Sequence, residues 1–383
     1  MPFVEFYLRM TNKKFTPKST WSKTYAAIKA SKRPARPVVN DVEISILEAG
    51  TSLSADSNML FSATTCGLMI ADYLKVNGNF WVGNSLLSND DTPSNWKSQS
   101  QFISLALSLA IVDKRGANFR CNFSDFERVW NVPNAILKRW QGKNEFGPDY
   151  VVWNLDGHNE YPDEFIILEC KGLKEEPNPA KFAKYKTQTL NHTSSFPVAR
   201  SILCNVHFEA TKPVKVDWFN ATAETTQNLG SEPIKCMIAF TQLATQLRYI
   251  GQEELASDFI AFARRDVPSA QFTTKMPQRL LNIFSAEPDF SLPATSPTDK
   301  SVKYLYDYRA FQKFIRAAYD FSYKNYDSSL KHIGEAVINS KQLEDSLRGT
   351  YNTDTDIKVY PTGVGFVQYR ERASEIYDRS SRD

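Results

Sequence analysis

Two short apolar runs of the chain end in charged residues of the kinds that bind metal ions and phosphate. Asp149 directly precedes the run Tyr150–Trp153, and Glu169 and Lys171 come just after the run Phe165–Leu168. A continuous apolar run of this length is typical of a strand that is buried on both faces. Because successive side chains of a strand alternate between its faces, Glu169 and Lys171 project side by side. Charges at the end of a buried strand are costly unless they are paired or bind a metal, so these residues indicate a site.

The segment between the two runs predicts how they pair. Residues 157–163 read Gly-His-Asn-Glu-Tyr-Pro-Asp, the composition of a turn or short loop, so the flanking strands are expected to form an antiparallel hairpin. A hairpin centred near residue 159 or 160 places Asp149 opposite positions 169–171. The sequence therefore predicts that two carboxylates and one lysine meet at one end of the sheet.

Two carboxylates beside a lysine are suited to holding a divalent cation against a phosphate group. Hard oxygen ligands suit Mg²⁺, which usually keeps several waters and also binds substrate phosphate. A metal at this place can polarise a phosphodiester and lower the pKa of a bound water. Lys171 could orient or deprotonate that water, or offset charge that develops on the phosphate. The backbone carbonyl of Cys170, between the two side chains, is a further candidate metal ligand.

These residues also resemble a known motif. Pro148-Asp149, followed after nineteen residues by Glu169-Cys170-Lys171, is similar to the motif of the PD-(D/E)xK nuclease superfamily. The resemblance covers roughly residues 120–210 and implies a restriction-endonuclease-like α/β fold, a mixed sheet flanked by helices with the motif on a central hairpin. It also implies an endonuclease that depends on Mg²⁺, for which Mn²⁺ can substitute. The resemblance further implies that Asp149 and Glu169 are metal ligands and that Lys171 is the catalytic lysine.

Two more site residues follow from the resemblance alone. Many members of the superfamily carry a further acidic residue on the helix before the first strand of the motif, and Glu127 is the candidate, with Glu145 second. Some members place a glutamine on the helix after the lysine strand, and Gln188 is suitably located for that role. By analogy with the family, restriction or anti-phage defence is the expected biological role.

Less specific explanations of the same pattern stay open. A Glu-x-Lys pair is frequent on exposed strands, so Glu169 and Lys171 could form a surface salt bridge. The chain could also be a nuclease fold that has lost its activity, or a non-catalytic nucleic-acid-binding or assembly protein. That last alternative predicts binding that is sensitive to salt and independent of metal.

The charge of the chain is unevenly distributed. The net charge is +3, but residues 1–40 hold nine basic residues, among them Lys13 and Lys14, and one acidic residue, Glu5. This segment, interleaved with aromatic residues, is either a solvated arm or a nucleic-acid contact. Lys181, Lys184 and Lys186 lie closer in sequence to the proposed site and are the preferred phosphate contacts. Together with the nuclease function that the resemblance implies, these lysines make nucleic acid, most of all double-stranded DNA, the expected partner.

The hydrophobic pattern divides the chain into three regions. Residues 1–115 are expected to form a basic arm and a helical region, with helices over 55–76 and 96–113. Residues 116–230 are expected to form the α/β nuclease core, with strands over 149–154, 164–170 and 201–209. Residues 231–383 are expected to be mainly helical with a terminal strand. The helices of this last region are predicted over residues 234–250, 253–264, 276–284 and 306–323, and the strand over 357–369.

Composition and motifs exclude several other classes of protein. The start of the chain lacks the pattern of a secretory signal, and no apolar run approaches the ~20 residues of a membrane span. The five cysteines are scattered and never form a CxxC pair, which favours reduced thiols in a cytoplasmic protein over disulfides or a zinc finger. P-loop, dinucleotide-binding and serine-hydrolase motifs are absent from the sequence. Cleavage of both DNA strands would favour a homodimer or a partner protein, although no interface can be identified from the sequence.

Overall fold

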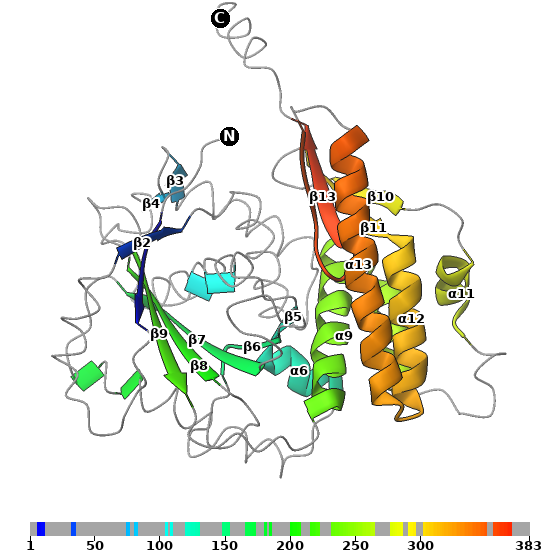
Figure 1. The fold of residues 1–383 in the computed structure, drawn as a ribbon, viewed down its shortest axis with the longest axis horizontal. Helices are drawn as coiled ribbons and strands as arrows, with labels where there is room; N and C mark the ends of the chain where they lie inside the picture. The colour runs from blue at the N-terminus through cyan, green and yellow to red at the C-terminus, as the bar shows by residue number, and fades with distance from the viewer. Residues whose placement is uncertain are drawn as a thin grey trace, which may run out of the picture. The chain divides into compact units, whose positions relative to one another are not determined.

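The chain divides into two compact units, Met1–Thr241 and Gln242–Asp383, each of which has its own sheet and helices. The fold is known from a computed structural model, shown in Figure 1. The residues that the structure describes are 6–11, 32–35, 74–76, 80–82, 104–105, 108–109, 119–130, 148–153, 165–173, 180–181, 184–185, 200–207, 215–222, 231–264, 276–285, 290–295, 302–350 and 355–369.

The first unit is built around a mixed sheet of seven strands in the order β2-β1-β9-β8-β7-β6-β5. Its strands, in chain order, are β1 (Phe6–Thr11), β2 (Lys32–Ala35), β5 (Phe119–Asn122), β6 (Tyr150–Trp153), β7 (Phe165–Leu173), β8 (Arg200–His207) and β9 (Lys215–Thr222). β5, β6 and β7 pair antiparallel in sequence order, and β7 then pairs parallel with β8. β8 is antiparallel to β9, which lies parallel to β1. The predicted α/β class is confirmed, and β7 and β8 lie side by side near the middle of the sheet (Figure 1).

Helical segments contact both faces of this sheet. On one face the Ser108 side chain hydrogen-bonds the Cys170 thiol, and Arg120 Nη1 donates to the Leu109 carbonyl at 3.3 Å. Ser108 and Leu109 lie in the segment predicted to be helical over 96–113, and its described residues are helical. On the other face the first part of α9 (Ser231–Tyr249) places the Lys235 ammonium 5.8 Å from the Trp153 ring centroid. The central strands are therefore buried on both sides, which explains their continuous apolar sequence.

Within residues 1–115 the described elements differ from the helical region predicted there, while residues 55–73 of the helix predicted over 55–76 lie outside the described residues. The described elements are mainly strands: β1 and β2 extend the seven-stranded sheet, and β3 (Leu74–Val76) pairs with β4 (Phe80–Val82). The expectation that this region is separate from the α/β core is corrected for these strands, because β1 pairs with β9. The physical reason is that strand pairing satisfies backbone groups through a partner about two hundred residues away, which local periodicity does not reveal.

The second unit combines helices with a four-stranded antiparallel sheet in the order β10-β11-β13-β12. Its elements after α9 are α10 (Glu253–Ala263), α11 (Gln278–Phe284), β10 (Phe290–Thr295), β11 (Val302–Asp307), α12 (Tyr308–Ser322), α13 (Tyr326–Thr350), β12 (Thr355–Val359) and β13 (Val364–Tyr369). The four predicted helices are confirmed as α9 to α12. The single terminal strand predicted over 357–369 is wrong, because the chain reverses at residues 361–363 and forms the hairpin of β12 and β13.

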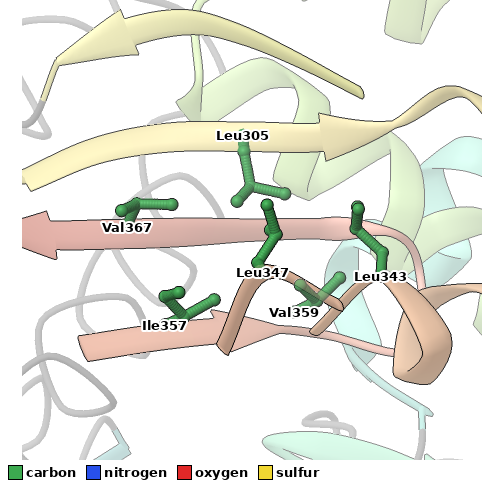
Figure 2. Packing of buried hydrophobic residues seen from close by; sticks show 6 residues of the cluster. All are labelled: Leu305, Leu343, Leu347, Ile357, Val359 and Val367. Atoms are coloured by element: carbon green, nitrogen blue, oxygen red, sulfur yellow. The ribbon is translucent and has the colours of Figure 1, made fainter. Parts of the chain in front are cut away.

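An apolar cluster joins α13 to its sheet. Figure 2 shows that the side chains of this cluster gather from α13 and from three strands. Its members are Leu305, Leu343, Leu347, Ile357, Val359 and Val367. All are at most 6 % exposed, so the cluster forms a core for the second unit.

No helix among the described residues is long and apolar enough to cross a membrane.

Candidate active site

The predicted hairpin is present, and its register brings Asp149 next to Glu169 and Cys170. β6 pairs antiparallel with β7, and Tyr150 lies opposite Leu168. Continuing this register by one residue places Asp149 opposite Glu169, as a hairpin centred at residue 159 requires. The contact is direct, since Asp149 Oδ2 accepts a hydrogen bond of 2.7 Å from the Cys170 N–H.

The backbone of Cys170 faces the acidic end of the hairpin. The N–H and C=O of one strand residue point to the same side of the strand, so the Cys170 carbonyl lies on the side of Asp149. Its thiol, by contrast, belongs to the sheet face that contacts Ser108, and burial followed by the charge of Asp149 raises its pKa well above the usual value. Of the metal-binding groups of Cys170, the carbonyl oxygen and not the thiol therefore lies on the side of the two acids.

Glu169 is a buried carboxyl group in an ion pair. Its side chain is 1 % exposed and accepts a short hydrogen bond from the Lys171 ammonium. Burial raises the pKa of Glu169, while Lys171 and a backbone hydrogen bond from Asp149 lower it in part. The same backbone hydrogen bond shows that the Glu169 carboxyl group lies beside Asp149, so the structure brings the two proposed metal ligands together.

Lys171 is held as a cation by the two acids. Burial by itself lowers the pKa of Lys171, but the charges of Glu169 and Asp149 outweigh burial and raise this pKa well above the usual lysine value. The ammonium also lies over the ring of Tyr185, 5.7 Å from the centroid. Of the lysine roles left open by the sequence, those of a cation are favoured over that of a proton acceptor at neutral pH.

The short helix α6 (Phe123–Trp130) begins at the site. The N–H of its first residue, Phe123, donates to the Asp149 carbonyl at 3.2 Å. Glu127, the acidic residue expected from the resemblance, lies on this helix and is half-buried. Asp125 lies closer to the helix start, is 3 % exposed, and helps to raise the pKa of Cys121. Asp125 is a second acidic candidate on α6, which was not predicted from the sequence.

The crossover between β7 and β8 contains Lys181 and Lys184, two of the lysines predicted to contact phosphate. Its described residues are helical, Lys181 and Lys184 are exposed, and Tyr185 is half-buried against Lys171. Tyr185 was not predicted, although it lies between two of the lysines that were. Five predicted residues lie outside the described part of the chain: Lys186, Gln188, Glu145, Lys13 and Lys14.

The donor set fits a cation that is held only in part by protein. Within the described ranges, no group of three or more His, Cys, Asp or Glu side chains is arranged to hold a metal ion. Asp149 and Glu169 supply two carboxylates, with the Cys170 carbonyl beside them. Mg²⁺ commonly binds through one or two carboxylates and completes its octahedral shell with water and substrate phosphate. The chemistry of these oxygen donors therefore suits Mg²⁺ or Mn²⁺.

No protein family, no curated protein and no solved structure matches the chain in the comparisons with known proteins.

Proposed function

We propose that this protein is a Mg²⁺-dependent endonuclease that hydrolyses phosphodiester bonds of DNA, in restriction or anti-phage defence. The observation that carries the proposal is the meeting of Asp149, Glu169 and Lys171 at one end of the β6–β7 hairpin. The mixed sheet, with this hairpin in its interior and helical segments on both faces, supports a restriction-endonuclease-like fold as part of the same proposal.

In the proposed mechanism the two acids hold the cation and the lysine acts as a charge. A bound Mg²⁺ would polarise the phosphate and lower the pKa of a coordinated water. Asp149 and Glu169 would hold and orient that ion. Lys171, kept protonated by both acids, stabilises the negative charge that grows on the phosphate during attack. Exposed Lys181 and Lys184 hold the neighbouring phosphates of the strand.

Cleavage of nucleic acid by the purified protein tests this proposal. We expect the protein to cut plasmid DNA with Mg²⁺ or Mn²⁺ and not with EDTA, and Asp149→Asn to lower the rate by at least about 100-fold. Asparagine keeps the size of the side chain and an oxygen for the Cys170 N–H, so only the charge is lost. The matched control is Asp258→Asn, which removes one acid of a surface ion pair with Arg279 in the second unit and should retain the activity.

Two outcomes would contradict the nuclease proposal. One is a wild-type protein that leaves plasmid, linear duplex, single-stranded DNA and RNA intact with both metals. The other is salt-sensitive DNA binding without any metal dependence, weakened by Lys13→Ala/Lys14→Ala and unchanged in Asp149→Asn. That second result would favour the non-catalytic binding protein instead.

Lys181 and Lys184 give a further prediction about binding. Each phosphate contact contributes about 0.9 to the slope of log affinity against log salt on duplex DNA, so Lys181→Ala/Lys184→Ala should reduce the slope by about 2. Fluorescence anisotropy with a labelled duplex and Ca²⁺ in place of Mg²⁺ would measure it. The double variant Lys331→Ala/Lys341→Ala, which removes two exposed lysines of α13, should leave the slope unchanged. Equal slopes for wild type and the Lys181→Ala/Lys184→Ala variant would show that the crossover between β7 and β8 does not contact DNA.

A further inference from the structure

Asn205 lies next to Lys171 on the neighbouring strand. β8 pairs parallel with β7 in a register that sets Asn205 beside Lys171 and Leu203 beside Glu169. Register partners on adjacent strands project from the same face of a sheet. Asn205 is therefore on the face that carries the acids and the lysine, on the opposite side of β7 from Asp149.

The amide of Asn205 is buried without hydrogen bonds. Its side chain is 0 % exposed, and neither Nδ2 nor Oδ1 has a hydrogen-bond partner in the part of the chain that the structure describes. Buried polar groups are nearly always paired, because leaving one unpaired forfeits its hydration. An amide with both ends unpaired beside a charged cluster thus indicates a missing partner.

The chemistry of an amide limits what that partner can be. Nδ2 only donates and Oδ1 only accepts, so an anion matches one end of the side chain and a metal cation the other. A water molecule matches both, because it accepts from Nδ2 and donates to Oδ1. The burial of Asn205 and Glu169, at 0 % and 1 % exposed, also requires a small occupant. Buried waters typically serve such polar groups.

We propose that Asn205 is a catalytic residue that holds the attacking water beside Lys171, an inference that rests on the nuclease function proposed above. The water oxygen forms a new bond to phosphorus while the bond from phosphorus to the leaving sugar oxygen breaks. In sum the OH of the water adds to phosphorus and its proton is delivered through solvent to the leaving oxygen. Lys171 stays protonated throughout, and the neutral amide orients the water without exchanging a proton.

Asn205→Leu tests the assignment, because leucine is close in size and makes no hydrogen bond. We expect kcat for plasmid cleavage to fall by about 100-fold with KM within about 2-fold of wild type. Mn²⁺ affinity, measured by isothermal titration calorimetry, should stay within about 2-fold, because Asn205 is not a metal ligand in this proposal. The thermal midpoint should stay close to that of wild type, since leucine is close in size and no hydrogen bond to another described protein group is lost. Asn205→Ser, which restores a donor and an acceptor, should recover part of the lost kcat.

A matched control separates this role from packing. Val206→Ala alters the next residue of β8, which is equally buried and projects from the opposite face, and should lower the thermal midpoint without lowering kcat. The inference is overturned if the wild type cleaves and Asn205→Leu stays within about 2-fold of its kcat, or if Asn205→Ser is as inactive as Asn205→Leu. A wild type that cleaves nothing, with Mn²⁺ affinity equal in Asp149→Asn, would instead overturn the nuclease function, and the inference with it.

Discussion

Lys171→Met is expected to lower the free energy of unfolding by up to about 3–4 kcal/mol at pH 7 in EDTA. The variant leaves the carboxyl group of Glu169, 1 % exposed, without its cationic partner. A buried carboxylate that loses its partner takes up a proton. From the ordinary carboxyl pKa of 4.5, protonation at pH 7 costs about 1.4 kcal/mol per pH unit, and because burial already raises this pKa in the wild type, the full cost is the upper limit of the loss. The cost of protonating the buried Glu169 carboxyl group therefore limits how much stability the variant loses.

The pH dependence of this loss follows from the direction of the shift. Burial already raises the pKa of Glu169, and removing Lys171 removes its main opposing influence, so the pKa rises further in the variant. The folded variant then binds a proton that the unfolded chain releases above about pH 4.5. The stability of the variant therefore falls as pH rises above about 4.5. Its difference from wild type should shrink toward zero as pH falls to about 4.5.

Urea denaturation followed by tryptophan fluorescence measures this effect. All seven tryptophans lie at or before residue 218, within the first unit, so the signal reports on the unit that contains the ion pair. The control is Lys171→Met/Glu169→Gln, in which a neutral side chain of the same size replaces the acid. We expect the double variant to recover most of the lost stability and to lose the extra pH dependence. An unchanged unfolding midpoint for Lys171→Met at pH 7 would show that the pair is not buried as described.

The hairpin of the site could be predicted because its information is local. Two apolar runs and a turn-like segment between them determine both the pairing and the register, and one residue of slip would put Glu169 and Lys171 on the wrong face. The observed pairing of Tyr150 with Leu168 matches that prediction. The same count of residues from the centre of the hairpin predicted that Asp149 lies next to the segment Glu169-Cys170-Lys171.

The contributions of β8 and of the crossover could not be predicted in the same way. A parallel pair has no connecting turn that sets its register, so nothing in the sequence indicated that Asn205 lies beside Lys171. Tyr185 also reaches Lys171 only through the path of the crossover. The pairing of β1 with β9 is another long-range contact, and its local sequence gave no sign of its partner.

The helix α13 was not among those predicted from the sequence, and the reason is a different one. Its buried positions include serines as well as apolar residues, so its apolar stripe is interrupted where Ser329 and Ser340 face the interior. Both hydroxyl groups donate to backbone carbonyls, of Ala317 and Ala336, which allows them to be buried in the helix packing. Hydrophobic periodicity underestimates a helix whose inner face contains small polar residues.

Gly365→Ala is expected to destabilise the second unit by about 3 kcal/mol. Gly365 lies in β13 between two strands, opposite Val359 of β12 and Leu305 of β11. A Cβ at this position would lie 2.1 Å from the Lys358 carbonyl oxygen and 2.9 Å from the Val359 Cα. Both are backbone atoms that cannot rotate away, so the strands themselves must move apart. The added methyl group would therefore disturb the sheet on which the apolar cluster of α13 packs (Figure 2).

The chain offers a matched control for this substitution in α13. An added Cβ at Gly349 meets nothing within 4 Å, so Gly349→Ala gains helix propensity without a clash. It should raise the free energy of unfolding by up to about 1 kcal/mol. Urea denaturation followed by circular dichroism at a helix band would compare the variants, and hydrogen exchange at β12 and β13 would locate the effect. The same chemical change would then have opposite signs at two glycines, and a Gly365→Ala protein as stable as wild type would rule out the close approach of β12 to β13.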